Sequence, residues 1–531
     1  MTDVIVIGAG HNGLIAAALL AKDKRRVLVL ERHDVVGGLA ITREIAEGFR
    51  APSLAPAIGP FHPHVLRALK KLKFDAHSLQ LITPDPALTT LGADGAAITF
   101  QRDPVFTAES INRVAPKDAG RWRECLDSLQ KLAAIFRELN ERPAPDMDHA
   151  SRTDLWHLFH TGRHARALGK KNLSRLLRYV PMAVADIASE WFEHDLLQAT
   201  IAVRALYGHF AGPWSAGTGA MLLQRLADDP MPFGGGITVA GGPGALTKAL
   251  ADVATQAGAT IRTNARVARI LVTNGHAAGV VLDTGEEIHA HAVLAAMAPK
   301  TVFEHLIDPA ELPPTFRQRV RNIRARGATA KLNLALSSRP AFPALHGDDQ
   351  ALRGRLLIAP DLDYLERAYD DAKYGELPAK PWLEISVPTV VDGTLAPADA
   401  HVMSIVAHTM PSPIRDHDWT GARDLLQRRI LDALAPHAPT LEASIVAAEL
   451  ITPADLESQY GLPGGHIYHA EQTIDQWWSM RPLLGWASGT TPIPRLFLTG
   501  AGTHGGGGIT GMPALHAAGT VAQALKGRAR A

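Results

Sequence analysis

The chain has 531 residues, a mass of 56.8 kDa and a formal net charge of +1 at pH 7. A chain of this length can bury a large core and is expected to form about two or three domains, which can be discontinuous in sequence. The balanced charge excludes nucleic acid and highly charged substrates as general partners. The single cysteine, Cys125, excludes an internal disulfide and a redox CxxC pair, and we expect it to be a packing residue.

The first informative segment is a glycine-rich turn between a predicted strand and a predicted helix. Residues 4–7 form an apolar run typical of a buried parallel strand, and residues 14–20 are strong helix formers. Between them lies a GxGxxG pattern, in which Gly8 makes the turn, Gly10 lets the backbone approach a pyrophosphate and Gly13 lets the helix pack closely on the strand. The N-terminus of the helix would face the phosphates.

A second apolar run, residues 27–30, ends in Glu31, roughly 20 residues beyond the glycines. A carboxylate at this place can accept hydrogen bonds from both hydroxyls of an adenosine ribose, and the alternative is a solvated charge at a strand end. Gly37 and Gly38 then give the backbone clearance needed by a cofactor that extends past its pyrophosphate. The sequence therefore predicts a Rossmann-type domain with non-covalently bound FAD rather than NAD.

Two further segments fit such a domain. Residues 267–272, 278–282 and 287–296 are predicted strands joined by tight turns at Asn274-Gly275 and Thr284-Gly285, which together form a β-meander. Near the C-terminus, a predicted strand runs into the glycine-rich residues 500–511 and then into a predicted helix, residues 512–525. Backbone N–H groups of this loop, placed at the pyrimidine edge of the isoalloxazine, would stabilise the negative charge that develops on reduction. The alternative is a surface loop.

These segments resemble flavoproteins related to phytoene desaturase. The resemblance rests on residues 8–14 (GAGHNGL), 31–38, 241–246 (GGPGAL), 266–267 and 496–512. It is closest to the subgroup of pyridine nucleotide-disulfide oxidoreductase domain-containing protein 2 and the desaturase-like carotenoid ketolases. The resemblance implies that the backbone of Val267 meets the adenine ring. It also implies that the C-terminal segment, with Gly502, Thr510, Gly511 and Met512, holds the flavin.

We therefore predict an α/β chain with a discontinuous FAD-binding domain at residues 1–70, 235–300 and 490–531. Residues 71–234 and 301–489 are expected to form a mixed α+β substrate domain with a helical part. Its first region is rich in aromatic side chains, which either line an apolar tunnel or pack in the core. These are Trp156, Phe159, Tyr179, Trp191, Phe192, Tyr207, Phe210 and Trp214.

A basic stretch in the same region predicts peripheral contact with an anionic membrane, a solvated helix face or a subunit contact in a homo-oligomer. It comprises Arg163, Arg166, Lys170, Lys171, Arg175 and Arg178, interleaved with Leu168, Leu173, Leu176 and Leu177. Met1-Thr2-Asp3 leads directly into the first strand, and no apolar run reaches the roughly 18 residues of a membrane span. We expect a cytoplasmic protein, soluble or peripheral at the membrane.

No catalytic residue stands out in the sequence. His504 lies in the flavin-binding segment and either acts beside the ring as acid, base or hydrogen-bond donor, or only holds the loop. His466 and His469 belong to a GxxGG-H-I-x-H motif that also resembles the subgroup, and they suggest a proton relay or metal ligands. Because no carboxylate or cysteine accompanies them at a recognised spacing, no metal site is predicted.

The predicted function is an FAD-dependent oxidoreductase acting on C–H or C=C bonds by hydride transfer to flavin N5. The resemblance implies an apolar, isoprenoid or carotenoid-like substrate, and it leaves desaturation, isomerisation and ketolation open. No second GxGxxG follows a predicted strand, so oxygen or a quinone is the expected electron acceptor. A flavin amine oxidase is the first alternative, although Leu39 stands where such enzymes often have an arginine. The second is a non-catalytic, FAD-stabilised interaction or lipid-carrier protein.

Overall fold

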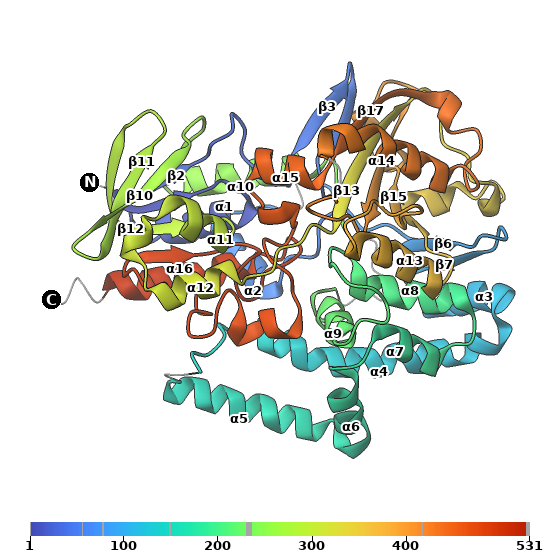
Figure 1. Cartoon of the computed structure of the whole chain (residues 1–531), viewed down its shortest axis with the longest axis horizontal. Helices are drawn as coiled ribbons and strands as arrows, with labels where there is room; N and C mark the ends of the chain where they lie inside the picture. The colour runs from blue at the N-terminus through green and yellow to red at the C-terminus, as the bar shows by residue number, and fades with distance from the viewer. Residues whose placement is uncertain are drawn as a thin grey trace.

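The computed structural model describes residues 2–55, 57–76, 79–147, 150–229, 236–415 and 418–526. Two seven-stranded sheets organise these residues, and Figure 1 shows the first sheet on the left with both termini and the second on the right. In the described ranges, no helix combines the length and the apolarity needed to cross a bilayer.

The first sheet has the strand order β10-β11-β12-β1-β2-β9, with β18 paired to β12. Its strands are β1 (Thr2–Ile7), β2 (Val27–Leu30), β9 (Thr260–Arg262), β10 (Val267–Thr273), β11 (His276–Leu282), β12 (Glu287–Ala295) and β18 (Leu496–Leu498). Strand β12 joins the meander to the parallel part of the sheet. Its first residues pair antiparallel with β11, and its last residues pair parallel with β1 and β18. The predicted Rossmann-type fold with a β-meander is therefore confirmed.

The apolar run of β1 is explained by burial on both faces of the sheet. Val4 and Val6 pack in a core with the helices α1 (His11–Ala21), α10 (Pro243–Gln256) and α16 (Met512–Lys526). Ile5 and Ile7 point to the opposite face, where they join a core with the strands of the meander. Because the side chains of residues 4–7 are all buried, apolar and polar residues do not alternate in this part of the strand.

The second sheet is mixed and has the order β17-β13-β16-β15-β14-β6-β7. Its strands are β6 (Leu88–Leu91), β7 (Ala97–Phe100), β13 (Thr329–Leu336), β14 (Arg355–Ile358), β15 (Leu383–Ser386), β16 (His401–His408) and β17 (Ile445–Ile451). On β13, Leu332 and Leu334 pack beneath the helix α14 (Trp419–Leu434), whereas Lys331 and Asn333 lie buried on the other face. This sheet therefore has one apolar face and one buried polar face.

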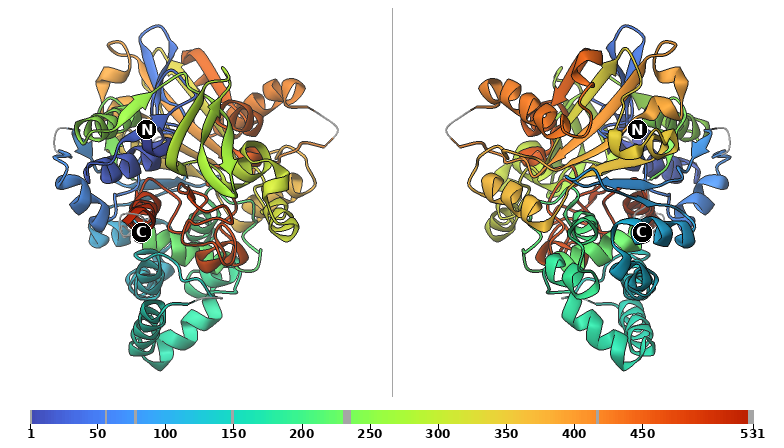
Figure 2. Two further views of the ribbon diagram at one scale, coloured as in Figure 1. Left: turned by 90° about the vertical axis from the view of Figure 1, so that its left-hand side faces the viewer. Right: turned by 90° about the vertical axis from the view of Figure 1, so that its right-hand side faces the viewer.

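A group of helices, most of which share a core with the second sheet, forms the lower part of the molecule in Figure 1. They are α3 (Pro104–Val114), α4 (Pro116–Asn140), α5 (Arg152–Ala167), α6 (Gly169–Tyr179), α7 (Val184–Trp191), α8 (Asp195–Leu206) and α9 (Thr218–Asp228). Cys125 is fully buried in their core, which agrees with a packing role. The helices α5 and α6 form an arm at one end of the molecule, visible in both side views of Figure 2.

Smaller elements connect these layers. They are β3 (Thr42–Ala46), β4 (Phe49–Pro52), α2 (Pro63–Lys70), β5 (Leu81–Ile82), β8 (Thr238–Val239), α11 (Pro299–Thr301), α12 (Pro314–Arg321), α13 (Leu362–Lys373) and α15 (Pro453–Tyr460). The two sequence regions of the predicted substrate domain contribute strands to one sheet, since β6 and β7 precede residue 234 and β13 to β17 follow residue 301. The predicted boundary at residues 234 and 235 lies outside the described residues, as does the end of the chain.

Candidate functional site: a dinucleotide cradle opening into a polar chamber

The turn between β1 and α1 is shaped by its three glycines in three different ways. Gly8 has a φ of +98°, a backbone conformation that L side chains rarely adopt. A Cβ at Gly13 would lie 2.0 Å from the carbonyl oxygen of Gly8, so this glycine is required for packing. A Cβ at Gly10 would meet no atom within 4 Å, because Gly10 faces a cavity of about 940 Å³. The turn therefore presents open backbone, and the N-terminus of α1, to a large cavity.

Glu31 lines the same cavity at the end of β2 and is only 5% exposed. One carboxylate oxygen accepts a hydrogen bond from the N–H of Ala9 at 2.8 Å, and the other accepts one from the N–H of His33 at 3.0 Å. A carboxylate has about four lone-pair sites, so two sites remain for donors of a ligand. Glu31 thus has a structural role in the turn together with free capacity toward ribose hydroxyls.

Gly37 and Gly38 bring a third segment to the turn. The N–H of Gly37 donates to the carbonyl oxygen of Ala9 at 2.9 Å, and a Cβ at Gly38 would lie 3.3 Å from the Cα of Gly10. Both glycines line the cavity, and so does Leu39, which packs on a small apolar cluster. The close approach of the two backbones explains why side chains are absent here.

Of the residues predicted to contact the two ends of the cofactor, some line the cavity and others do not. Val267, at the start of β10, lines the cavity, as does Thr510 in the C-terminal loop. Gly502, Gly511 and Met512 are not among the lining residues. A Cβ at Gly502 would lie 2.4 Å from Pro299 Cδ, and one at Gly511 would lie 2.8 Å from Val65 Cγ1, so these glycines permit packing. Met512 is buried in the core around α1.

The C-terminal loop is braced by Arg481, whose role the sequence did not suggest. Arg481 is fully enclosed, and its guanidinium donates to the carbonyl oxygens of Tyr468 (2.8 Å), Glu471 (2.8 Å) and Ala501 (2.7 Å). Burial lowers the pKa of Arg481 to about 9. Gln472 adds a hydrogen bond from its amide to the carbonyl of Gly506. Arg481 therefore fixes the loop that carries Gly500, Ala501 and Thr510 to the cavity wall.

The histidines proposed from the sequence separate into lining and non-lining groups. His504 does not line the cavity: its Nε2 lies 2.9 Å from the carbonyl oxygen of Arg142 and 3.1 Å from that of Leu139. Burial lowers the pKa of His504 to about 4, so it is a neutral donor that holds the loop against α4. His469 lines the cavity, whereas His466 is buried behind it and accepts a hydrogen bond from the N–H of Tyr468 at 3.2 Å.

Beyond the glycine turn, the cavity opens into a chamber between α9 and the polar face of the second sheet. Arg225 lies with its guanidinium carbon 5.0 Å from the ring centroid of Tyr207, and its Nη1 is 3.4 Å from the hydroxyl of Tyr468. On the sheet, Arg355 forms an ion pair with Glu384 at 2.6 Å. We name these five residues, together with Asp228, the polar chamber.

Asp228 is the titratable group of this chamber whose charge changes near neutral pH. Asn140 Nδ2 donates to its carboxylate at 3.1 Å, and burial raises the pKa of Asp228 to about 7, against the opposing effect of Arg225. Its neighbour Asp229 is instead paired with Arg204 at 3.0 Å. Perturbed carboxylates that line a cavity are candidates for proton transfer. Sequence reasoning missed Asp228 because nothing in the local pattern of α9 distinguishes it.

The aromatic tunnel considered from the sequence is not formed by the described residues. Of the eight aromatic residues in question, Tyr207 alone lines the cavity. Trp156, Phe159 and Trp214 are exposed on the surface, and Trp191 and Phe192 are buried among the helices. The glycine turn, Glu31 and Gly37-Gly38 form the part of the cavity that we name the cradle. Charged side chains occupy the chamber wall because α9 and the second sheet, rather than the aromatic helices, face this cradle.

Together, the turn with open backbone at Gly10, the carboxylate of Glu31 in the cavity wall and the cavity that continues past them fit FAD. The fold and this cradle define the class of protein: the chain is an FAD-dependent oxidoreductase. A family model for flavin-containing amine oxidoreductases matches residues 13–526, and the chain belongs to that family. The predicted relationship to phytoene desaturase-related FAD oxidoreductases is confirmed.

Relatives with known names match almost the whole chain. Pyridine nucleotide-disulfide oxidoreductase domain-containing protein 2 of Rattus norvegicus is 30% identical over 99% of this chain and 94% of its own length. One subunit of the limonene dehydrogenase of Castellaniella defragrans is 27% identical (98% and 94%). The zeta-carotene-forming phytoene desaturase of Myxococcus xanthus is 26% identical (95% and 90%). The solved structure of cyclohexylamine oxidase from Brevibacterium oxydans shares the fold, with a TM-score of 0.58 at 18% identity (99% of each chain).

Proposed function

We propose that this FAD-dependent oxidoreductase removes a hydride and a proton from adjacent positions of an isoprenoid-like substrate, so that a C=C bond forms. FAD, when bound, supplies the acceptor for the hydride at N5. The proposal rests chiefly on one observation: a carboxyl group with a pKa near 7, Asp228, lines the chamber into which the cradle opens. Two relatives are named for limonene and phytoene, which are hydrocarbon isoprenoids, and these names support the substrate class.

The roles of the chain's own residues follow from the chamber. Asp228, as carboxylate, accepts the proton that leaves the substrate carbon. The aliphatic side chains Leu39, Ile58 and Ile467, which also line the cavity, would contact the hydrocarbon part of the substrate and exclude water. Arg225, with Tyr207 and Tyr468, would hold a polar group of the substrate. We therefore expect an apolar skeleton that carries an oxygen function, with oxygen or a quinone as the electron acceptor.

An amine substrate is the second candidate, because the same chamber has carboxylates. Asp229 and Glu384 line it, but each is already paired with an arginine, Arg204 and Arg355 respectively. Asp228 has no arginine within ion-pair distance among the described residues, so it alone would face an ammonium group. An amine would therefore compete for the group that we assign to proton transfer.

The experiment is an anaerobic titration of the purified flavoprotein with isoprenoid alcohols, isoprenoid hydrocarbons and amines, monitored by the loss of oxidised-flavin absorbance. Bleaching by isoprenoids that is at least about ten times slower in Asp228→Asn supports the proposal. Bleaching by amines alone would assign the chain to amine oxidation. A bound flavin that no compound of either class reduces would support the non-catalytic alternative.

A further inference from the structure

A cluster of metal-ligating side chains lies outside the lining of the cavity, between α4 and α5. His160 and His164 are one helical turn apart on α5, so both side chains lie on one face of the helix. Glu138, in the last turn of α4, lies opposite them. One ligand atom of each residue lies within 4.8 Å of the others. The ligand set, two imidazoles and one carboxylate, is one that zinc sites use.

The distances are close to those of a coordination shell. His164 Nδ1 lies 2.7 Å from one oxygen of Glu138, and His160 Nδ1 lies 3.5 Å from the other. Ligand atoms at about 2.0–2.1 Å from a tetrahedral zinc ion are about 3.3 Å apart, between these two values. His160 Nδ1 is buried and has no hydrogen-bond partner among the described residues. Small side-chain rotations therefore suffice to bring the three ligand atoms around one ion.

The surroundings prepare the carboxylate and leave one coordination position open. The hydroxyl of Thr161 donates to Glu138 Oε1 at 2.8 Å, which orients the carboxylate as outer-shell groups do in metal sites. His157, one turn earlier, contacts Arg142 instead. The outer sides of His160 and His164 are solvent-accessible, so water can be the fourth ligand.

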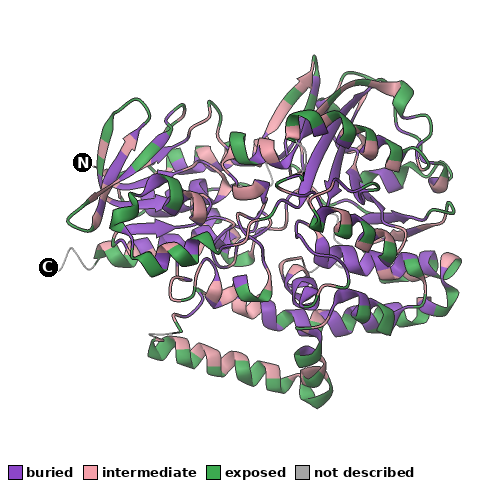
Figure 3. Cartoon of the chain, viewed as in Figure 1, coloured by how far each residue is buried: buried purple, intermediate pink, exposed green. Residues whose placement is uncertain are grey.

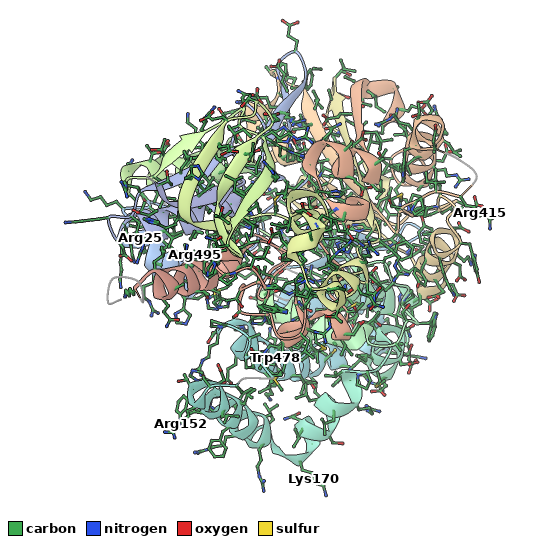
Figure 4. All side chains as sticks on the ribbon, turned by 60° about the vertical axis from the view of Figure 1, so that its left-hand side comes forward. Arg25, Arg152, Lys170, Arg415, Trp478 and Arg495 are labelled. Atoms are coloured by element: carbon green, nitrogen blue, oxygen red, sulfur yellow. The ribbon has the colours of Figure 1, made fainter. Side chains whose placement is uncertain are left out.

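The position in the fold suggests what such an ion would do. The helix α5 has no buried residue, and Figure 3 shows it in the exposed and intermediate colours along its whole length. Figure 4 shows Arg152, at its start, and Lys170, at the start of α6, projecting from the edge of the molecule. Apolar burial therefore contributes little to holding α5 in place.

We propose that Glu138, His160 and His164 bind one zinc ion per chain, and that this ion fastens α5 to α4. None of the three residues lines the cavity, so the proposal does not rest on the proposed reaction. Other divalent transition metals with an affinity for imidazole, such as cobalt, would occupy the same position.

The test uses the full-length flavoprotein, freed of metals by a chelator and then titrated with zinc chloride in a calorimeter. We expect one equivalent to bind with a dissociation constant of about a micromolar or tighter. Cobalt chloride should give the visible absorption bands of a tetrahedral ion. His160→Gln and His164→Gln should each weaken zinc binding at least about 10-fold, whereas His289→Gln, an exposed histidine of the meander, should not.

Hydrogen exchange gives a second readout. Zinc should slow amide exchange in α5 of the native protein and have no such effect in His160→Gln. Unchanged flavin absorbance and an unchanged thermal midpoint of the metal-free variants would show that they fold. Binding only in the millimolar range, or binding that survives in a His160→Gln/His164→Gln double variant, would overturn the proposal.

Discussion

The carboxylate of Glu31 accepts a hydrogen bond at 2.8 Å from the N–H of Ala9, which ties the end of β2 to the glycine turn after β1. Glu31→Gln keeps the shape of the side chain but removes its charge and offers the Ala9 N–H a weaker acceptor. A hydrogen bond to a charged group contributes about 1.5–3 kcal/mol, so we expect FAD affinity to fall about 10- to 100-fold. Flavin release followed by fluorescence measures this. Glu47→Gln, at an exposed position, should retain FAD normally, and equal retention in both variants would contradict the assignment.

The substitution of alanine for Gly10 and for Gly13, two of the three glycines of the turn, should have opposite effects. At Gly10, whose φ is −68°, alanine is conformationally allowed and its Cβ meets no protein atom, so Gly10→Ala should fold with a nearly unchanged thermal midpoint. Its methyl group would occupy the path of the pyrophosphate, and flavin content should fall severely. In Gly13→Ala the Cβ clashes with the carbonyl of Gly8, so the fold itself should be destabilised by about 1–3 kcal/mol or more. The flavin absorbance of the two variants as purified, together with the thermal unfolding of their apoproteins, distinguishes these effects.

The pH dependence of substrate oxidation is set, in our assignment, by Asp228. Its pKa is raised to about 7, and the group must be deprotonated to accept a proton, so the rate of flavin reduction should rise with pH through about 7 and then level off. The charged groups that face it are Arg225 and Asp229 on its own segment and Arg137 on α4.

Stopped-flow reduction between about pH 5.5 and 9 would give this profile, with a midpoint of about 7. Asp228→Asn should abolish the rise and lower the plateau, while Asp186→Asn, at an exposed site of α7, should leave both unchanged. A profile identical in native protein and Asp228→Asn would refute the role of this carboxylate.

From the burial of Lys331 we predict that the stability of the protein, rather than its activity, depends on pH. Its amino group is completely buried, with no hydrogen-bond partner in the part of the chain that the structure describes, and burial lowers its pKa from 10.5 to about 7. Between these two values the unfolded chain binds more protons than the native chain, so the free energy of unfolding rises as pH increases from 7 to 10.5. Below the lower value, both states are charged and the destabilisation is complete.

Lys331→Met should remove this slope, worth at most about 1.4 kcal/mol per pH unit, and should stabilise the protein most at and below neutral pH. Urea unfolding at a series of pH values measures the difference between the two proteins. Lys380→Met, at an exposed lysine, should behave like the native chain.

Local signals explain which parts of the fold the sequence reveals. The glycine turn and the meander are encoded within short segments, so their strands and turns can be predicted from the local sequence, and α16 ends within one residue of its predicted limit. The second sheet is different, because β6 pairs in parallel with β14 from far along the chain. No local pattern specifies such a pairing.

The polar chamber also could not be predicted from local sequence, because tertiary packing alone brings its residues together. Arg225 and Asp228 look like ordinary residues of an amphipathic helix, and they become a site only because α9 packs beside the second sheet. Likewise, the spacing of His160 and His164 is visible in the sequence, but Glu138 joins them only through the packing of α5 on α4. Conversely, Gly502 and Gly511 share the glycine-rich signature of the loop, and yet they serve packing against Pro299 and Val65.

The cavity wall is assembled from both ends of the chain, with Gly8 on one side and Thr510 on the other. A ribosome-bound chain that has completed both the glycine turn and the meander still lacks β18 and the loop braced by Arg481. Cofactor insertion must therefore follow the synthesis of nearly the whole polypeptide. During translation, the glycine turn and the meander are therefore complete long before β18 and the C-terminal loop close the cavity around the cofactor position.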